Sequence, residues 1–472
     1  MHWLKRYSFP LLLFAIAWGV RLIPVLLTRS LGIGLDDMFQ YDMLGRSLAS
    51  GNGFRWYASP DLHLILKFVP LDLSRVPYDP RGVLTSFRAP LYPLFLALIY
   101  SLNGLEGRFF AARLVQSFLA ALLPLLTWLL GRRLFNEGVA RAAAWSVTFY
   151  PMLIAFPLAL ATENLFFLLV LLSILLLVRL GESPSWGGAM ALGFSFGLAA
   201  LTRSVVLLMA AAALLWLILD RRLYRYALVA GVTLFLTIFP WMLRNSLLHH
   251  RLTGLETSMG YNLYVGYHPQ SDGTFTFGPS LDLLTIVDDA ERDRIGTQKA
   301  IEFIRQSPGR ALFLVLRRFG HFFAPEWRAF TFFYASNLLG PLPPVLLIAI
   351  YLLLTLPWWS IAIGGIWGWA FLAEESTQRL LAYLFIGYLL PHLLILSEER
   401  FHLTLVPLFS LLAVHFWTRG RRAAPEAKRG ALYLAAIVTL FLVIYWVERV
   451  VTFWPVFLRL LGPAGNQLML PY

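Results

Sequence analysis

Long apolar stretches separated by short polar segments run through the whole chain. A helix that spans a membrane needs about 20 predominantly apolar residues. The pattern therefore predicts an all-α polytopic membrane protein with about 11 spans (11–13) whose external loops carry juxtamembrane helices. The predicted spans fall near residues 9–28, 110–131, 138–157, 159–178, 187–202, 204–219, 226–242, 342–372, 379–396, 402–417 and 431–447.

Composition supports this class and excludes others. The 472 residues are 58% hydrophobic and 14% charged, whereas about a quarter of residues are charged in soluble domains. The net charge of +13 comes from short clusters of Lys and Arg between apolar spans, a distribution typical of membrane insertion and not of nucleic-acid binding. The chain has no cysteine, which excludes disulfides, thiolate metal sites and cysteine nucleophiles.

The basic clusters predict the orientation, because cytoplasmic loops are enriched in Lys and Arg. The clusters are Lys5-Arg6, Arg132-Arg133 with Arg141, Arg179, Arg221-Arg222 with Arg225, and Arg419-Gly420-Arg421-Arg422 with Lys428-Arg429. Phe9–Leu27 has no small-residue cleavage site after it, which is typical of a signal anchor with a cytoplasmic N-terminus. We therefore expect segments 29–109 and 243–341 to lie outside the cytoplasm.

Three segments refine this scheme. Pro90–Leu105 is only about 16 residues long, so we favour a re-entrant or membrane-associated helix over a full crossing, which would invert every later loop. Pro357 could divide 342–372 into two shorter helices. Asp288–Phe323 has helical periodicity with a charged face, which predicts one or two interfacial helices. The predicted organisation is an N-terminal membrane module (1–242), a second external loop (243–341) and C-terminal spans (342–472).

An acidic cluster, Gly34-Leu35-Asp36-Asp37-Met38-Phe39-Gln40-Tyr41-Asp42, follows the first span on the external side. Asp36 and Asp37 could simply cap a helix. Alternatively, a carboxylate at a low-dielectric boundary can act as a general base toward a hydroxyl. Nucleotide-sugars and ATP are generally unavailable on this side, so chemistry here would need a donor delivered by a lipid.

Four arginines, Arg21, Arg88, Arg113 and Arg203, are predicted to converge on the same outer face. A guanidinium suits a pair of phosphate oxygens, although each of these side chains could instead snorkel to lipid headgroups. Glu163 either complements a helix dipole or faces the same cavity. We expect Glu398-Glu399 to form an interfacial turn, and His249-His250 to be solvated because no third ligand stands at metal spacing.

A series of short motifs resembles a known family. The motifs are Asp36-Asp37 with Tyr41, Gly51-Asn52-Gly53-Phe54, Arg88-Ala89-Pro90-Leu91-Tyr92-Pro93, Thr162-Glu163, Leu201-Thr202-Arg203, Pro240-Trp241-Met242-Leu243-Arg244-Asn245, and Arg400 before a span that contains Pro407. In this order, from about residue 10 to 415, they resemble the GT-C glycosyltransferases. The likeness is to the branch that contains protein O-mannosyltransferases and the aminoarabinose transferase that modifies lipid A.

The resemblance implies a GT-C-like helix bundle and an inverting glycosyltransferase, which takes a sugar from a polyprenyl-phosphate carrier and places it on an acceptor hydroxyl outside the cytoplasm. It implies no required divalent metal, membrane lipids as partners and a prokaryotic plasma-membrane location. The acceptor (lipid, glycan or protein) stays open, although no large soluble domain follows Pro-Trp, which argues against a protein. The family's usual Asp-Glu pair is Asp-Asp here, so which carboxylate is the base also stays open.

The predicted site follows from the residues and the resemblance together. Asp36 and Asp37 are predicted to be catalytic, and Arg88, Arg113, Arg203 and Arg21 to bind the donor phosphate. Tyr41, Tyr92, Glu163, Arg244, Asn262 and Arg400 are predicted to line the substrate cavity.

Two other functions compete with the transferase. A transporter or flippase for polyprenyl-linked sugars would also need external cations, but transporters commonly show internal repeats and place charges near the midplane, and neither is evident here. A structural subunit would leave the external arginines unexplained.

Overall fold

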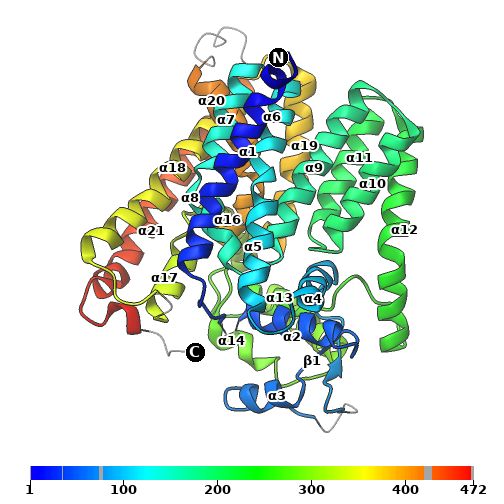
Figure 1. The fold of residues 1–472 in the computed structure, drawn as a ribbon, viewed down its shortest axis with the longest axis vertical. Coiled ribbons are helices and arrows are strands. Elements are labelled where there is room, and N and C mark those ends of the chain that lie inside the picture. Colours follow the sequence, from blue (N-terminus) through cyan, green and yellow to red (C-terminus); the bar gives the residue numbers. More distant parts are fainter. Residues whose placement is uncertain (1, 35, 74–77, 338, 419–427, 469–472) are drawn as a thin grey trace.

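The computed structural model describes residues 2–34, 36–73, 78–337, 339–418 and 428–468. The chain forms a bundle of long helices with shorter helices gathered at one end (Figure 1). The first half contains α1 (His2–Leu27), α2 (Asp37–Ala49), α3 (Ser59–Ile65), α4 (Leu91–Asn103), α5 (Arg108–Ala120), α6 (Leu122–Leu134), α7 (Glu137–Thr148), α8 (Pro151–Ala155), η1 (Phe156–Leu158), α9 (Glu163–Glu182), α10 (Trp186–Ala200) and α11 (Val206–Leu219). The second half contains α12 (Tyr224–His249), α13 (Met259–Tyr267), α14 (Phe277–Asp282), α15 (Asp289–Gln306), α16 (Pro308–Phe322), α17 (Trp327–Ala335), α18 (Pro344–Ala370), α19 (Glu375–Leu394), η2 (Glu399–Leu405), α20 (Val406–Thr418), α21 (Arg429–Leu460) and η5 (Gly465–Gln467).

Each predicted span corresponds to one or more helices, but fewer helices than expected are long and apolar enough to cross a membrane. Within the described residues, seven helices are long and apolar enough to cross a membrane, and the pair α7 with α8–η1, bent by 58°, would make an eighth. The seven are Ser8–Leu27, Arg108–Leu134, Glu163–Glu182, Tyr224–His249, Pro344–Ala370, Glu399–Thr418 and Arg429–Leu460. The remaining predicted spans are the short apolar helices α10 and α11 and the more polar α19. The all-α membrane fold is thus confirmed, and the count of eleven crossings is not.

The three segments that the sequence left ambiguous have clear forms in the structure. Helix α4 has 13 residues, about 20 Å at 1.5 Å per residue, which is too short for a hydrocarbon core of about 30 Å. Pro357 lies inside α18, which continues as one helix of 27 residues. The segment 288–323 forms two helices, α15 and α16.

The two long loops lie at the same end of the bundle. Helices α2, α3, α13 and α14 gather there, opposite the N-terminal end of α1 and the turn between α6 and α7 (Figure 1). A short antiparallel pair, β1 (Arg55–Trp56) with β2 (Val83–Leu84), closes the first loop, with Arg55 opposite Leu84. This pairing sets the position of the residues just after β2, which include Arg88.

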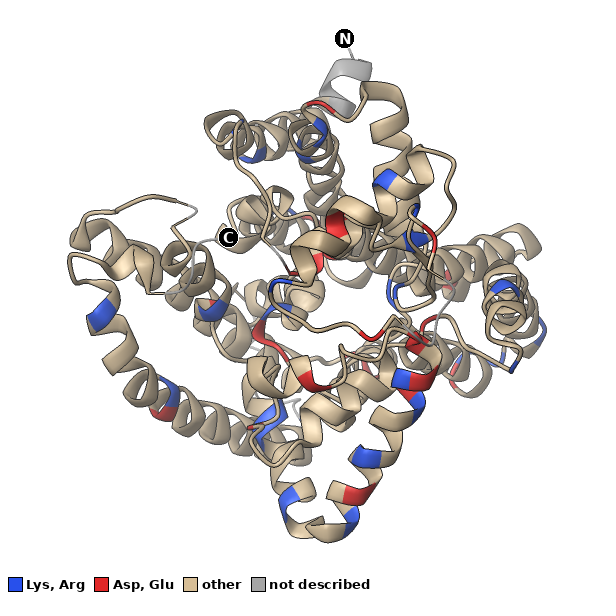
Figure 2. Ribbon diagram, turned by 90° about the horizontal axis from the view of Figure 1, so that it is seen from below, with Lys and Arg blue, Asp and Glu red and all other residues tan. Residues whose placement is uncertain are grey.

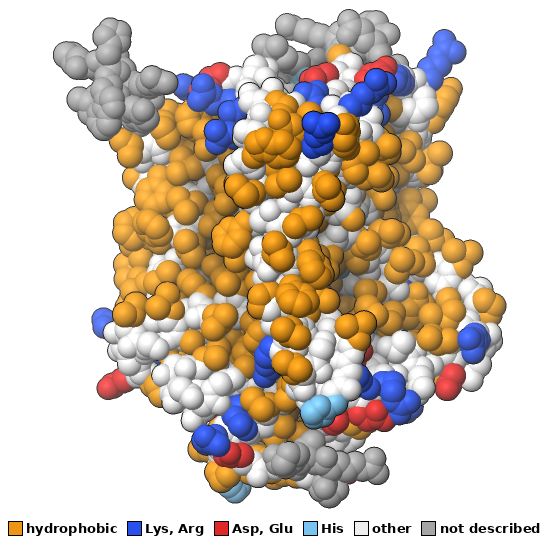
Figure 3. Space-filling view, turned by 90° about the vertical axis from the view of Figure 1, so that its right-hand side faces the viewer, with side chains coloured by type: hydrophobic (Ala, Val, Ile, Leu, Met, Phe, Trp, Pro, Cys, Tyr) orange, Lys and Arg blue, Asp and Glu red, His pale blue; other side chains and the backbone are white. Residues whose placement is uncertain are grey.

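A wide hydrophobic belt separates the two ends of the molecule. In Figure 3 the belt lies below a rim rich in Lys and Arg and above a region where acidic and basic side chains mix. Seen from the loop end, charged positions also occur around the middle of the ring of helices (Figure 2). Charged residues among the helices of a membrane protein are candidates for a functional site.

Small residues allow the closest helix contacts. A Cβ atom added at Gly365 or Gly368 of α18 would come within 2.3 Å of Phe409 or 2.1 Å of the Leu412 carbonyl oxygen on α20. Helices in membranes associate by such close packing of small residues. The α18–α20 contact fixes η2, which immediately precedes α20 and carries Arg400.

Labelling of single cysteines tests the orientation, because the chain has none of its own. We expect an impermeant maleimide to label Phe277→Cys, whose position is 70% exposed at the loop end, from outside intact cells. Asn136→Cys, in the turn between α6 and α7, should react only after permeabilisation. The reverse pattern would place the loop end in the cytoplasm. The Arg419–Arg422 cluster lies outside the described residues.

Candidate active site

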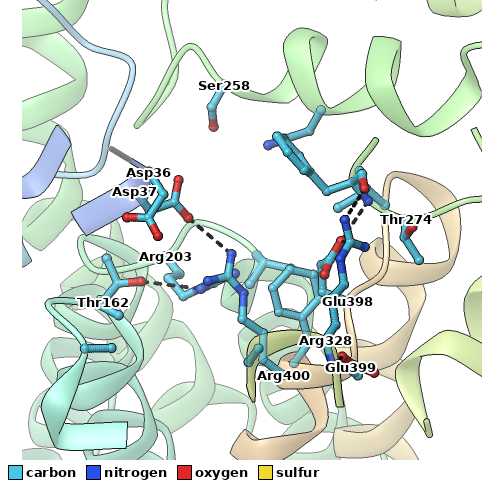
Figure 4. A pocket seen from close by; sticks show the side chains of 18 of the residues that line it. Asp36, Asp37, Thr162, Arg203, Ser258, Thr274, Arg328, Glu398, Glu399 and Arg400 are labelled. Carbon is cyan, nitrogen blue, oxygen red and sulfur yellow. Dashed lines mark hydrogen bonds and ion pairs between the residues drawn. The ribbon is translucent and has the colours of Figure 1, made fainter. Parts of the chain in front are cut away.

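A cavity of about 2090 Å³ opens between the helices and the loop end. Its wall includes the start of α2, the segment 87–89, the turn between α10 and α11, parts of α13 and α17, and η2. Charged side chains from these distant segments face the same space (Figure 4). We therefore take this cavity as the candidate active site.

Asp37 lies at the centre of the charged group. Its Oδ1 accepts a short hydrogen bond from Arg88, and its Oδ2 accepts one from Arg400 Nη2 at 3.1 Å. Burial opposes ionisation of Asp37, but the two guanidiniums outweigh burial and hold the pKa of this carboxyl well below its usual range. Asp37 is therefore a fixed anion that orients two cations.

Glu163 extends this charged group into a row of five side chains. The charged row consists of Arg88, Asp37, Arg400, Glu163 and Arg203. Glu163 Oε1 lies 2.6 Å from Arg203 Nη1 and 3.7 Å from Arg400 Nε. Glu163 is 3% exposed, so it lies behind the two arginines and does not face the cavity. Arg88, Arg400 and Arg203 thus share two carboxylates, and the row keeps one positive charge in excess. Such a row suits an anionic group that enters the cavity.

Asp36 differs from its neighbour. Its Oδ1 accepts a hydrogen bond from Met38 N at 2.8 Å and so caps α2, while Oδ2 has no hydrogen bond among the described residues. Burial, and then the charge of Asp37, raises the pKa of Asp36 to about 6, with the Met38 amide acting in the opposite direction. Capping and a chemical role are therefore compatible, since each uses a different oxygen.

The segment that carries Arg88 is braced from behind. Buried Asp289 accepts hydrogen bonds from Thr85 Oγ1 at 2.7 Å and from Ser86 N at 2.6 Å. Arg244 donates to the Thr85 carbonyl at 2.6 Å. Arg88 also donates to Gln40 at 2.9 Å, and this network holds its guanidinium against Asp37.

The structure brings together seven of the twelve predicted site residues. Those that line the cavity are Asp36, Asp37, Arg88, Arg203, Tyr41, Asn262 and Arg400. Those that do not are Arg21, Arg113, Tyr92, Glu163 and Arg244.

The geometry corrects the prediction that Arg21 and Arg113 bind the donor phosphate. Arg21 is fully buried and donates to the carbonyls of Ala17, Val147 and Thr148. Arg113 is 1% exposed and donates to the carbonyls of Leu31, Gly32 and Leu158. Both arginines thus satisfy backbone groups where helices end inside the bundle, which an apolar environment requires.

Three residues predicted to line the cavity support it from outside. Tyr92 is fully buried and donates to Gln116 at 2.6 Å. Glu163 fixes Arg203, as described above. Arg244 stacks on Trp241, with its guanidinium carbon 4.8 Å from the ring centre, and braces the loop before Arg88.

A second polar group on the cavity wall was not expected. Arg328 donates to Glu398 at 3.0 Å and to the Phe275 carbonyl, and its backbone amide donates to Glu399. Glu398 and Glu399 are therefore buried cavity residues, and the predicted interfacial turn is wrong. Arg449 of α21 also lines the cavity. The sequence signal for this group is weak, namely isolated charges beside aromatic residues in Glu326-Trp327-Arg328 and Trp446-Val447-Glu448-Arg449.

His249 is also less solvated than predicted. Its Nε2 lies 2.7 Å from Ser86 Oγ, and its ligand atoms lie within 4.8 Å of those of Asp288 and Asp289, a group that could hold a metal ion. Asp288, however, already caps α15 by accepting hydrogen bonds from Ala290 N and Glu291 N. The histidine therefore acts first as a brace for the Arg88 segment.

Comparison with known proteins adds a family match over part of the chain and a fold. Residues 87–243 match the family model of the dolichyl-phosphate-mannose-protein mannosyltransferases. No curated protein matches the sequence. The matched segment contains Arg88, Glu163 and Arg203, three of the five members of the charged row.

Two archaeal structures share this architecture at low sequence identity. The apo oligosaccharyltransferase of Archaeoglobus fulgidus aligns with a TM-score of 0.51 and 14% identity over 100% of this chain and 61% of that chain. The AglB oligosaccharyltransferase from the same organism, in complex with an inhibitory peptide and a dolichol-phosphate, aligns with a TM-score of 0.50 and 13% identity over 100% of this chain and 60% of that chain. ArnT from Cupriavidus metallidurans, bound to undecaprenyl phosphate, gives a TM-score of only 0.41 at 13% identity, over 89% and 80% of the two chains.

The chain thus spans about three fifths of the length of the archaeal structures that it matches. Identities this low establish the fold and leave the activity to be argued from the site. The chain is an integral-membrane protein with the GT-C glycosyltransferase fold, and it resembles the dolichyl-phosphate-mannose-protein mannosyltransferases over residues 87–243.

Proposed function

We propose that this protein is an inverting glycosyltransferase that moves a sugar from a polyprenyl-phosphate carrier to an acceptor hydroxyl on the extracytoplasmic face of the membrane. The proposal rests on the different contacts of two adjacent carboxylates. Asp37 is held by Arg88 and Arg400, whereas Asp36 keeps one oxygen without a hydrogen bond among the described residues.

The charged row suits a phosphate that leaves. Arg88, Arg203 and Arg400 all line the cavity, and each carries N–H groups beyond those used in its carboxylate contacts. Fixed cations of this kind bind the donor phosphate and stabilise the negative charge that develops on its oxygen. A phosphate monoester is a good leaving group, so no separate general acid is required.

Asp36 completes the reaction. It removes the proton of the acceptor hydroxyl, and the acceptor oxygen forms a bond to the anomeric carbon. The bond from that carbon to the phosphate oxygen breaks on the opposite side, and its electron pair leaves with polyprenyl phosphate. In-line attack inverts the anomeric centre, and the proton stays on Asp36 until solvent removes it.

The comparisons support the same class of reaction. The matched family is named for dolichyl-phosphate-mannose and for mannosyl transfer to protein, and the AglB structure is a complex with an inhibitory peptide and a dolichol-phosphate. The basic turns opposite the loop end support an extracytoplasmic site, as the orientation bias predicts. Mixing purified protein with polyprenyl-phosphate mannose and following the release of polyprenyl phosphate tests the proposal. A protein that moved the intact lipid across vesicles without breaking the glycosidic bond would be a flippase instead.

The pH dependence of the reaction should report Asp36. The base must be ionised, so protonation below its pKa of about 6 removes activity. We expect kcat/KM to fall about tenfold per pH unit below about 6 and to be level just above it. Asp37 stays ionised throughout this range, so it adds no further fall to the pH profile of kcat/KM. A profile flat down to pH 4.5 in a folded enzyme would show that the base is another group.

A further inference from the structure

The cavity has two apolar walls, and they lie on opposite sides. One wall comes from α11 and α12 and includes Leu208 and Phe235, which are 45% and 49% exposed. The other comes from α17, α18 and α21 and includes Phe330, Leu353 and Phe453, of which Leu353 is 55% exposed. Figure 1 shows α11 and α12 on one side of the molecule and α17, α18 and α21 on the other. Both walls therefore reach side chains on the lipid-facing surface of the bundle.

At least one arginine lies beside each apolar wall. Arg203 lies in the turn immediately before α11, and Arg328 and Arg449 lie on α17 and α21 themselves. In Figure 4, Arg203 and Arg328 lie on opposite sides of Arg400. A cation at the polar end of an apolar wall is the arrangement that an anionic amphiphile requires, since headgroup and chain are satisfied together.

The contacts of Arg449 give the strongest indication that an anionic ligand binds at the second wall. Arg449 Nε is buried without a hydrogen-bond partner, and the structure shows no ion pair for its guanidinium among the described residues. Glu399 is near enough to interact electrostatically with Arg449, but it is already the acceptor for the Arg328 amide. Glu398 is likewise engaged by Arg328 and by Phe275 N. Within the described residues, Arg449 thus has Glu399 as a nearby charge but no ion pair, and its Nε has no acceptor. A guanidinium in this state beside an apolar wall can bind an anion from outside the chain.

The size of the cavity agrees with two occupants. Its volume of about 2090 Å³ is at least twice that of a site for a single small ligand, about 300–1,000 Å³. A donor whose phosphate contacts Arg203 would place its chain along α11 and α12. The wall of α17, α18 and α21 would then be left for a second molecule.

We infer that the acceptor is itself an anionic membrane lipid, which enters between α17, α18 and α21 with its headgroup on Arg328 and Arg449. This inference rests on the proposed transfer reaction. In that reaction a headgroup hydroxyl of the lipid loses its proton to Asp36 and joins the anomeric carbon as the carbon–phosphate oxygen bond breaks. Donor and acceptor thus meet from opposite sides of the bundle, on either side of Arg400.

Binding of the lipid is tested without the reaction. The full-length protein is placed in phosphatidylcholine vesicles that contain phosphatidylglycerol with a photoactivatable acyl chain, and labelled peptides are mapped. We expect labelling of α17 and α18 to fall about tenfold in Arg449→Gln, the loss expected for one charge-assisted hydrogen bond. Arg459→Gln, an exposed cation on the same helix, should label like the parent. Equal labelling in Arg449→Gln and the parent, or equal labelling by a phosphatidylcholine probe, would overturn the anionic site.

The acceptor role is tested with radiolabelled polyprenyl-phosphate mannose in the same vesicles. We expect sugar on lipid in the parent and in Leu352→Trp, whose residue is 51% exposed but does not line the cavity. Leu353→Trp should raise the KM for the acceptor lipid about tenfold, while Leu353→Ala, which leaves the wall open, should not. Sugar transferred only to water or to a soluble glycan, equally in Leu353→Trp and the parent, would overturn the inference alone. A parent that never consumes the donor would refute the proposed function instead.

Discussion

Replacing Asp36 with Asn is expected to lower turnover by about 10²–10⁴, the usual contribution of a general base. The carboxamide has nearly the same volume, and its oxygen can still accept the hydrogen bond from Met38 N that caps α2. Fold and donor affinity should therefore stay close to those of the parent. Steady-state transfer from polyprenyl-phosphate mannose, together with donor binding by calorimetry, measures both quantities.

Asp37→Asn provides the matched comparison, because it removes an adjacent carboxylate of the same size. The change leaves Arg88 and Arg400 without their shared anion, so we expect altered donor affinity and impaired turnover. The fall in activity at acidic pH should remain, because Asp36 is intact, but it should move to a lower pH, because the Asp37 charge that raises the pKa of Asp36 is gone. The residual activity of Asp36→Asn should lack this fall. Loss of the fall in Asp37→Asn and its retention in Asp36→Asn would exchange the two roles.

Replacing Arg203 or Arg400 with Ala is expected to weaken donor binding by about 1.5–3 kcal/mol, or roughly 10–150-fold in Kd. Both residues line the cavity, and neither uses all of its guanidinium N–H groups in the carboxylate contacts described above. Lysine at either position should recover only part of the affinity, because it restores the charge without the planar fork. Titration of the parent and the variants with polyprenyl phosphate in nanodiscs measures the effect.

Two further variants separate phosphate binding from a general loss of positive charge. Arg294→Ala removes an exposed arginine of α15 that pairs with Glu291 away from the cavity, and it should bind the donor like the parent. Arg113→Met should lower the thermal midpoint, because three backbone carbonyls lose their donor, while the protein that stays folded keeps its donor affinity. Weaker binding in folded Arg113→Met than in Arg203→Ala would restore Arg113 to the phosphate site.

Local features of the sequence are sufficient to predict the membrane helices and part of the candidate site. Apolar runs of fixed length predicted the helices, since hydrocarbon thickness sets the length of a span. The short run after Pro90 predicted a helix that does not cross, and α4 has 13 residues. Asp36, Asp37 and Arg88 were identifiable because charged residues beside apolar segments are costly unless they have a role. Position along the chain and residue type carry all of this information.

Which arginine faces the cavity was decided by the tertiary structure alone. Arg21, Arg88, Arg113 and Arg203 look alike in sequence, each an isolated cation next to an apolar stretch. Two of them, Arg21 and Arg113, donate to backbone carbonyls of α7, of η1 and of the segment that follows α1. The other two lie beside Asp37 and Glu163. The sequence shows where a cation is along the chain. Only the packing of distant helices shows whether its neighbours are backbone carbonyls or a carboxylate.

The same reason explains why Arg328, Glu398 and Arg449 were missed and why Asp36 and Asp37 could not be told apart. The first three are separated by 50 residues or more along the chain, and no local pattern predicts that they share one wall. The two aspartates have the same local sequence, and they differ because Arg88 and Arg400 contact Asp37, whereas one oxygen of Asp36 has no hydrogen bond among the described residues. Sequence by itself determined the membrane fold and the candidate groups. The tertiary structure decided their partners, because the charge state and orientation of a buried group are set by what packs against it.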